Sequence, residues 1–193
     1  MRLFVALDIE DPIRARIATF MDGVSGFAPD ARWVKAESLH VTLKFIGEWE
    51  RDRLPQLEAT LQAVQSGPTV LAFRGHGFFP TARAARVFLV GIEADANLAE
   101  LARKVDEACA SLGMAREERA FSPHLTLARG KSGAPGRRRD DRPNRKFERL
   151  QQKLASWVAP DFGTMTAREF FLYESKLSPA GSHYSKLKRF ELS

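Results

Sequence analysis

The sequence predicts an α+β fold of two lobes that an internal duplication relates by a pseudo-twofold axis, with antiparallel sheets facing a central cleft and helices packed outside. The first observation behind this prediction is that helix-periodic and strand-like segments alternate in nearly the same order in both halves of the chain. The second is a repeated pattern of His, an apolar residue, Thr and Leu. It occurs at residues 40–43 and 124–127, so the offset is 124 − 40 = 84.

Four segments carry apolar residues at helical spacing, which predicts helices with one buried face. They cover residues 11–23, 51–66, 96–112 and 145–158. Seven runs rich in Val, Leu, Phe and Thr are predicted as strands. These are residues 3–9, 40–46, 69–79, 86–93, 124–128, 164–174 and 184–192. No glycine-rich phosphate loop follows any of these runs, so the pattern does not indicate a dinucleotide-binding fold.

The offset of 84 extends beyond the repeated motif. It brings residues 2–5 (RLFV) onto residues 86–89 (RVFL), the first predicted helix near the third, and Ser38 onto Ser122. After the motifs the register slips, because the second half contains an extra basic run. The helix at 51–66 then matches that at 145–158, and FRGHGFF roughly matches REFFLYE. Since no linker separates the halves, we expect residues 1–193 to form one bilobal domain.

The charge balance is basic, with a net charge of +6 and a pI near 9.8. A basic protein suits a polyanionic partner such as RNA, although a generic basic surface gives the same balance. Residues 131–146 hold seven basic and two acidic residues among Gly, Pro, Ser and Asn, which predicts a basic loop. This loop either steers RNA electrostatically or only keeps the surface solvated.

Cysteine usage and hydropathy point to the cytoplasm. The one cysteine, Cys109, excludes an internal disulfide and lies on the apolar stripe of a predicted helix, so a core position is expected rather than a thiol nucleophile. The chain has no long apolar run and begins without a signal-peptide pattern, so we expect no membrane partner.

The two motifs can carry acid–base chemistry. Residues two apart on a strand share a face, so His40 lies with Thr42, and His124 with Thr126. A pseudo-twofold axis would bring these faces together as two imidazoles flanked by two hydroxyls. One histidine can remove a proton while the other supplies one, and Thr hydroxyls can donate hydrogen bonds to phosphate oxygens. This set of groups, with the basic charge, favours a phosphodiester substrate.

Other interpretations of the histidines remain open at this point. A lone strand histidine is usually structural, but two copies at one duplication offset are harder to dismiss. Paired histidines can bind zinc, yet no third ligand accompanies either motif, so we expect no metal and no cofactor. His76 and His183 have no repeated context and are expected to be structural or surface residues.

The sequence resembles the 2H phosphoesterase superfamily, which is defined by two His-x-Thr/Ser motifs. Within it, the chain is most similar to the bacterial RNA 2′,3′-cyclic phosphodiesterases, also called 2′-5′ RNA ligase-like or LigT-like proteins. The resemblance runs nearly end to end. It is carried by MRLFVALDI, RWVKAESLHVTLKFIGE, FSPHLTLAR and YESKLSPAGSHYSKLKRFEL.

The resemblance implies roles for six residues: His40 and His124 as the acid–base pair, Thr42 and Thr126 on the phosphate, and Phe45 and Arg129 flanking the nucleobase. Both a phenyl ring and a guanidinium can stack on a base. Strict alternation would place Phe45 and Arg129, five positions after each histidine, on the face away from the histidine, unless the strands bend near Gly47 and Gly130.

The predicted function is metal-independent hydrolysis of a 2′,3′-cyclic phosphate to a 2′-phosphomonoester, by a monomer that acts on RNA 3′ ends or cyclic nucleotides. We assign His124 as general base and His40 as general acid, although the near symmetry lets either take either role. The alternatives are reversible 2′-5′ RNA ligation at the same site, and a non-catalytic nucleotide- or RNA-binding module. The difference between Lys44-Phe45 and Ala128-Arg129 is the predicted source of substrate direction.

Overall fold

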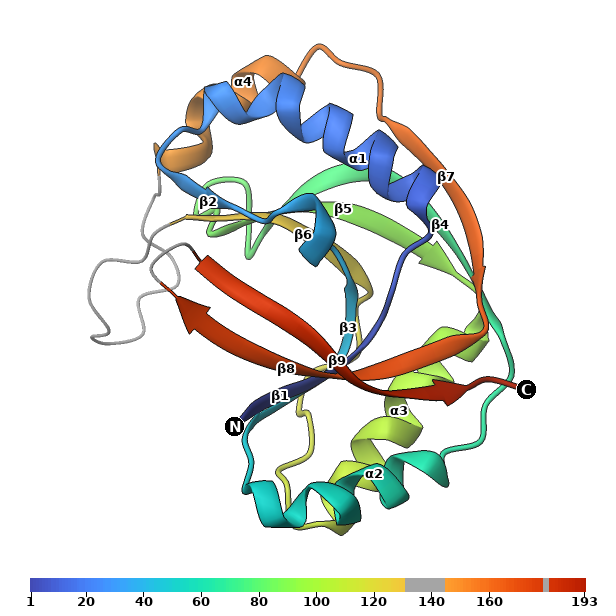
Figure 1. The fold of residues 1–193 in the computed structure, drawn as a ribbon. Coiled ribbons are helices and arrows are strands. Elements are labelled where there is room, and N and C mark those ends of the chain that lie inside the picture. The colour runs from blue at the N-terminus through green and yellow to red at the C-terminus, as the bar shows by residue number, and fades with distance from the viewer. Residues whose placement is uncertain (131–144, 179–180) are drawn as a thin grey trace.

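The computed structural model describes residues 1–130, 145–178 and 181–193. Within them lie nine strands and four α-helices, and the strands form two antiparallel sheets (Figure 1). Most of the basic run predicted as a loop, residues 131–144, lies outside the described residues.

The first sheet has the order β3-β1-β8-β9 and the second the order β2-β6-β5-β4-β7. The strands of the first sheet are β1 (Arg2–Leu7), β3 (Val41–Glu48), β8 (Glu169–Ser178) and β9 (Gly181–Glu191). Those of the second are β2 (Ala31–Trp33), β4 (Thr69–Phe79), β5 (Val87–Ala94), β6 (His124–Gly130) and β7 (Asp161–Ala167). Every strand pair in both sheets is antiparallel.

The strand orders confirm the predicted pair of related lobes. The series β3-β1-β8-β9 corresponds, strand by strand, to β6-β5-β4-β7, with β2 as an addition to the second sheet. The rough match of FRGHGFF with REFFLYE is confirmed at the level of the strands, because β4 and β8 hold equivalent places. The lobes are not the two halves of the chain, however. Strand β4 joins the second sheet, and β8 and β9 return to the first, so each lobe contains strands from both halves.

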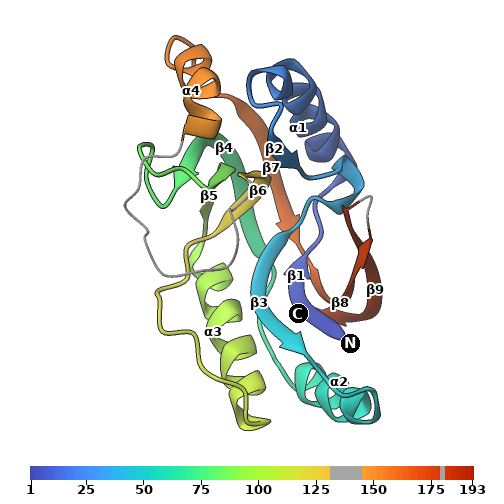
Figure 2. The same cartoon turned by 90° about the vertical axis from the view of Figure 1, so that its left-hand side faces the viewer.

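The helices also cross between lobes. They are α1 (Asp11–Val24), α2 (Leu54–Gln62), α3 (Ala96–Ser111) and α4 (Glu148–Leu154). Helix α1 follows β1 of the first sheet but contacts β7 of the second. Helix α3 follows β5 of the second sheet and contacts β3 of the first as well as β4 of the second. Figures 1 and 2 show α1 and α4 at one end of the molecule and α2 and α3 at the other, outside the sheets.

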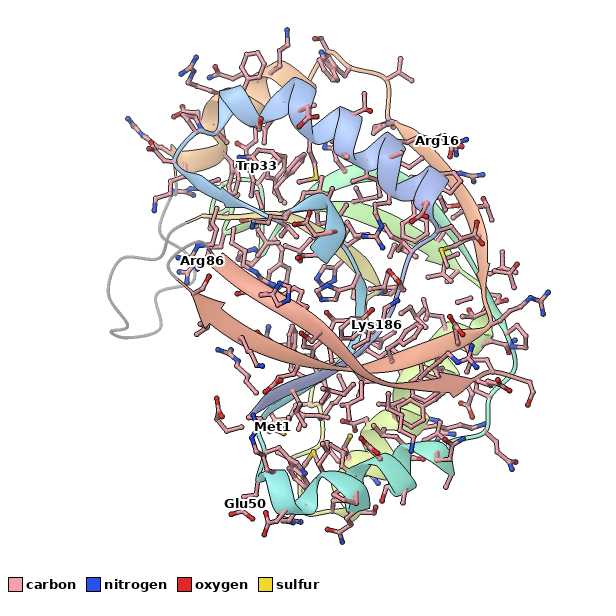
Figure 3. The ribbon with its side chains drawn as sticks, in the orientation of Figure 1. Met1, Arg16, Trp33, Glu50, Arg86 and Lys186 are labelled. Carbon is pink, nitrogen blue, oxygen red and sulfur yellow. The ribbon has the colours of Figure 1, made fainter. Side chains whose placement is uncertain are left out.

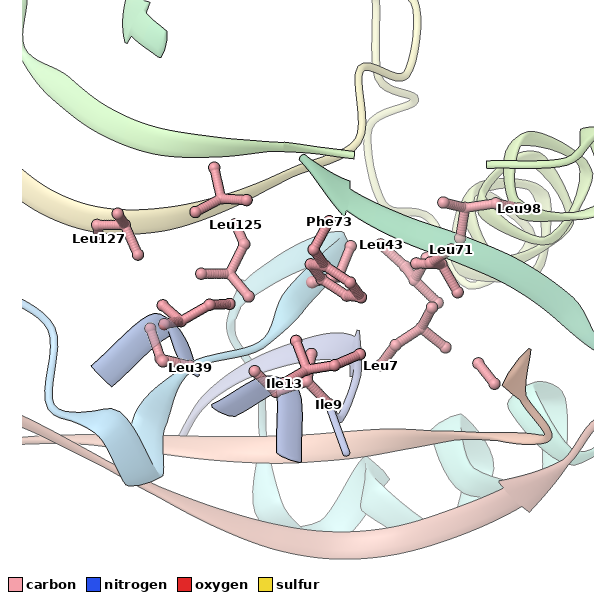
Figure 4. Packing of buried hydrophobic residues seen from close by; sticks show 14 of the residues in the cluster. Leu7, Ile9, Ile13, Leu39, Leu43, Leu71, Phe73, Leu98, Leu125 and Leu127 are labelled. Carbon is pink, nitrogen blue, oxygen red and sulfur yellow. The ribbon is translucent and has the colours of Figure 1, made fainter. Parts of the chain in front are cut away.

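One hydrophobic cluster joins the helices to both sheets. Leu43 from β3 and Leu125 and Leu127 from β6 project into it together with Phe73 of β4 (Figure 4). Cys109 is fully buried in the same cluster, as expected, and burial raises the pKa of its thiol to about 11. None of the helices among the described residues is long and apolar enough to cross a membrane.

Three element predictions need correction. The run at 164–174 is two strands, β7 and β8, that belong to different sheets and are separated at Arg168. No glycine or proline marks the point where the chain changes sheets, at Arg168, so the run was taken as a single strand. Strand β2 was missed because three residues are too short for a periodic signal. The helices predicted at 51–66 and 145–158 begin with 3₁₀ turns and end early, at Gln62 and Leu154.

Candidate active site

Both motif histidines are oriented by the same backbone contact. His40 Nδ1 lies 2.7 Å from the Ser38 carbonyl oxygen, and His124 Nδ1 lies 2.9 Å from that of Ser122. A carbonyl only accepts, so Nδ1 of each ring carries a proton and donates it. The Nε2 atoms are therefore the nitrogens available to a substrate. The serines two residues before each histidine, which the duplication offset matched, supply this contact through their backbone.

A β-bulge follows the histidine in the first motif. Thr42 is paired with Ala6 of β1, but the next residue of β1, Val5, is paired with Lys44, so Leu43 is skipped. An extra residue on one strand reverses the alternation beyond it. Leu43 and Lys44 are therefore both buried, and Phe45 returns to the face of Thr42, where its side chain is exposed.

The second motif contains the same bulge. Thr126 is paired with Leu89 of β5 and Ala128 with Phe88, so Leu127 is skipped. The burial pattern along residues 125–129 (buried, partly buried, buried, buried, exposed) repeats that along residues 41–45. Arg129 accordingly returns to the face of Thr126.

The two bulges decide where the residue five positions after each histidine lies. The Phe4 ring lies 4.8 Å from the His40 ring and 6.2 Å from the Phe45 ring, measured between centroids, so all three side chains share one face of the first sheet. The change in direction predicted near Gly47 and Gly130 occurs earlier, at the fourth residue of each motif.

Lys44 does not help to break the symmetry of the site, contrary to the sequence-based prediction. Because the bulge leaves Lys44 on the core side, its ammonium binds Asp106 of α3 at 2.5 Å and the Ala115 carbonyl oxygen at 2.8 Å. Ala128 is buried. The asymmetry on the face of the histidines comes from Phe45 and Arg129.

The strand pairing also shifts the duplication offset by one residue in β1. Phe4 is paired with Phe45, and Val87 is paired with Arg129, so the counterpart of Phe4 is Val87 at an offset of 87 − 4 = 83. An ungapped offset of 84 matches Phe4 with Phe88, whose side chain lies in the core. A one-residue slip exchanges the faces of a strand, which is why the sequence match alone misplaces this residue.

The short strand β2 connects the two motifs. It is paired with β6 through Arg32 and Arg129, and the N–H of Val34, just after β2, donates to the Leu127 carbonyl oxygen at 2.8 Å. The chain then runs directly into His40 and β3, which contacts β6. The positive charge of Arg129, from the second motif, acts on the ring of His40 in the first. The structure thus brings the two motifs together, as the sequence predicted.

Arg14 of α1 fixes the segment before His40. Its guanidinium donates to the carbonyl oxygens of Ala36 at 2.7 Å and Leu39 at 3.3 Å, and to the Asp8 carboxylate at 2.5 Å. Asp8 also accepts from the Lys186 ammonium. Burial acts to raise the Asp8 pKa, but these two cations and the Ile9 N–H outweigh it and hold the pKa below its ordinary value.

Aromatic rings line the site beside His40. Tyr184 meets the His40 ring edge-on at 5.2 Å, and Tyr173 stacks on Phe4 at 5.0 Å. Burial is the main cause that lowers the pKa of His40, aided by Arg129 and opposed by the Ser38 carbonyl. His40 is therefore harder to protonate in the free protein than an ordinary imidazole. His124, by contrast, is exposed to solvent.

Sequence reasoning missed these neighbours of His40. One usable signal was composition, because Tyr173 and Tyr184 are the only tyrosines of the chain and both lie in its closing segment. Lys186 lies two residues beyond Tyr184, and Figure 3 shows it near the centre of the molecule. Asp8 lies six residues before Arg14 but 178 before Lys186, so its pairing with Lys186 leaves no local pattern in the sequence.

The remaining candidate ligands lie apart in the fold. His76 is half-buried on β4 and His183 is exposed on β9, consistent with the expected structural or surface roles. Among the described residues, no three His, Cys, Asp or Glu side chains converge as a metal site would require.

Comparison with known proteins places this site in a family. The model of the 2′-5′ RNA ligase superfamily matches residues 9–160. The chain belongs to this superfamily, whose members are 2H phosphoesterases. It is 35% identical over 191 residues to a protein of Archaeoglobus fulgidus named RNA 2′,3′-cyclic phosphodiesterase, and this match covers 99% of the chain and 100% of the relative.

Solved structures of the superfamily share the whole fold. A Thermus thermophilus protein matches with a TM-score of 0.78 at 27% identity, covering 100% of this chain and 98% of its own. E. coli LigT, solved in complex with 3′-AMP, matches with a TM-score of 0.77 at 27% identity over the same shares of the two chains. The predicted family and α+β fold are confirmed.

Proposed function

We propose that this protein is an RNA 2′,3′-cyclic phosphodiesterase that opens the cyclic phosphate at an RNA 3′ end to a 2′-phosphomonoester. The observation that carries the proposal is the matched pair of histidines, each with Nδ1 bonded to a serine carbonyl and each beside a threonine on its strand face. The full-length relative named for this activity supports the same conclusion.

The reaction follows from two proton transfers. His124 Nε2 removes a proton from water as the water oxygen bonds to phosphorus. His40 Nε2 gives a proton to the 3′ oxygen as the bond between phosphorus and that oxygen breaks. Thr42 and Thr126 donate hydrogen bonds to the non-bridging oxygens, where negative charge grows. Phe45 and Arg129 flank the base, and no metal takes part.

The division of roles rests on exposure. Bulk water reaches the exposed His124, whereas His40 lies against Phe4 and Tyr184. The lowered His40 pKa works against its role as acid, because an acid must carry a proton. A bound phosphate anion counteracts this, since a nearby negative charge raises the pKa of an imidazole.

Turnover of a 2′,3′-cyclic nucleotide in the presence of EDTA tests the proposed activity. We expect a 2′-phosphate product and the same rate with and without the chelator. Binding of the nucleotide without turnover would instead indicate a non-catalytic binding module. A product with a 3′-phosphate would contradict the assigned leaving group.

The leaving group can separate the two histidine roles. A nitrophenyl phosphodiester releases a stable phenolate that needs no proton, so loss of the general acid should matter little with it. We expect His40→Ala to lose far less activity on this substrate than on the cyclic nucleotide, by a ratio on the order of tenfold or more. His124→Ala should lose activity similarly on both substrates. The reverse pattern would exchange the roles.

Ligation is a second candidate because the family model is named for 2′-5′ RNA ligation. It uses the same displacement at phosphorus, with a 5′-hydroxyl of a second RNA attacking the cyclic phosphate in place of water and the 3′ oxygen leaving as before. An assay with a cyclic-phosphate RNA and a 5′-hydroxyl RNA would detect a joined product that either histidine substitution abolishes.

A further inference from the structure

A basic pocket lies beyond the proposed nucleobase position. Its volume is about 400 Å³, within the range of roughly 300–1,000 Å³ that is common for small-molecule sites. Its lining consists of Phe79, Pro80, Arg86, Val87, Arg119, Arg129 and Gly130. Three of these residues are arginines and none is acidic.

Strand pairing places this pocket on the face that carries the site. Phe79, Val87 and Arg129 are paired in a row across β4, β5 and β6. Leu89, two residues from Val87 along β5, is paired with Thr126. Residues two apart on a strand share a face, so the row of Arg129 follows the row of Thr126 on one surface.

The spacing suits a polynucleotide that continues from the site. His124 is paired with Gly91, four residues from Val87 along β5, so the pocket row lies roughly 13 Å from the row of His124. Figure 3 shows Arg86 toward the edge of the molecule, away from Lys186 near the centre. The pocket therefore lies outward of the proposed reaction centre and on the same surface.

The lining matches the chemistry of a nucleotide. A guanidinium presents a fork of N–H donors that fits phosphate oxygens, and the part of the chain that the structure describes pairs neither Arg119 nor Arg129 with a carboxylate. Phe79 is 50% exposed although it is a large apolar side chain on a sheet. Exposed aromatic rings beside arginines are typical of surfaces on which single-stranded bases stack.

We propose that this pocket binds the nucleotide on the 5′ side of the cyclic end, with its phosphate on Arg119 and Arg129 and its base on Phe79. The inference deepens the proposed function: the substrate is an RNA strand rather than a mononucleotide. Arg129 then lies between the terminal base and the next nucleotide.

Two substrates and three variants test the pocket. The substrates are a short oligoribonucleotide with a 2′,3′-cyclic phosphate end and the corresponding 2′,3′-cyclic mononucleotide. We expect Phe79→Ala and Arg119→Ala each to lower kcat/KM for the oligonucleotide about tenfold and to leave the mononucleotide value within about twofold. Arg116→Ala is the matched control. Arg116 is an exposed arginine of the same segment that lies 3.9 Å from Glu107, and its removal should change neither value.

Binding of the same oligonucleotide with a 3′-hydroxyl end, measured by fluorescence anisotropy, tests the pocket without any turnover. Arg119→Ala should weaken this binding and reduce the slope of log affinity against log salt by about one. If the wild type turns over neither substrate, the proposed function fails, and the anisotropy result still decides the pocket. Equal losses on both substrates, or no loss on the oligonucleotide, would overturn the pocket assignment.

Discussion

His40→Ala and His124→Ala are each expected to lower kcat for a 2′,3′-cyclic nucleotide by on the order of 10²-fold or more. Each substitution removes one of the two proton transfers. Without the base, water must attack unaided, and without the acid, the 3′ oxygen must leave as an alkoxide. Steady-state turnover of the purified variants measures the effect.

The two substitutions should not add when they are combined. Each proton transfer belongs to the same displacement at phosphorus, so the double variant should be little slower than the slower single variant. His183→Ala is the matched control, because His183 is exposed on β9 and outside the proposed pair. Activity retained in both single variants would refute the mechanism, provided that circular dichroism shows folded protein.

Much of the candidate site could be predicted because its four-residue motif occurs twice in the sequence. The repeated His-x-Thr-Leu gave both histidines and both threonines, and the offset also matched Ser38 with Ser122. The structure shows that these serines act through their carbonyl oxygens. The side chain at this position is therefore not what orients the histidine, and a sequence match could not reveal the contact.

The bulges could not be predicted from either motif. Alternation assumes one residue per position, and Leu43 and Leu127 each break it without glycine or proline to mark the break. Lys44 shows the result most clearly. Its difference from Ala128 predicted that it helps to break the symmetry of the site, yet the bulge turns it inward to Asp106 on α3.

The sequence also did not reveal that the two lobes exchange strands and helices. Periodicity locates a helix and its buried face, but it does not indicate which sheet that face covers. The contact of α1 with β7, and that of α3 with β3, depend on the path of the chain between lobes. The contacts that fix His40 depend on the same path, since Arg14 belongs to α1.

Lys44→Met is expected to lower the free energy of unfolding by about 3 kcal/mol. The Lys44 and Asp106 side chains are 8% and 16% exposed, so removing the ammonium leaves a carboxylate largely out of water without its partner. Denaturant unfolding of the folded variant measures the loss. Lys188→Met is the control, because Lys188 pairs with Glu58 at 3.4 Å but is 38% exposed, and a surface pair contributes less than about 1 kcal/mol.

Adding Asp106→Asn to Lys44→Met distinguishes two causes of the lost stability: the unpaired charge on buried Asp106 and the loss of its contact with Lys44. In the double variant Lys44→Met/Asp106→Asn no charge is left buried, and the asparagine can still accept the hydrogen bond that Asp106 accepts from the Glu117 N–H. We expect the double variant to regain part of the stability that Lys44→Met loses. A double variant less stable than Lys44→Met would contradict this, because it would mean that the Asp106 carboxylate stabilises the fold even without Lys44.

The effect of Lys44→Met should also depend on pH. Burial acts to raise the Asp106 pKa, but the Lys44 ammonium and the Glu117 N–H outweigh it and hold the pKa below its ordinary value of 3.8. A carboxylate with a lowered pKa stabilises the folded state above its unfolded pKa, and that contribution is lost as the pH falls through the folded value. The difference in free energy of unfolding between wild type and Lys44→Met should therefore have its full size at pH 7 and shrink below about pH 4. Two effects reduce this difference at low pH. Protonation of Asp106 removes the ion pair from the wild type, and it also leaves the Lys44 ammonium buried without a counter-charge.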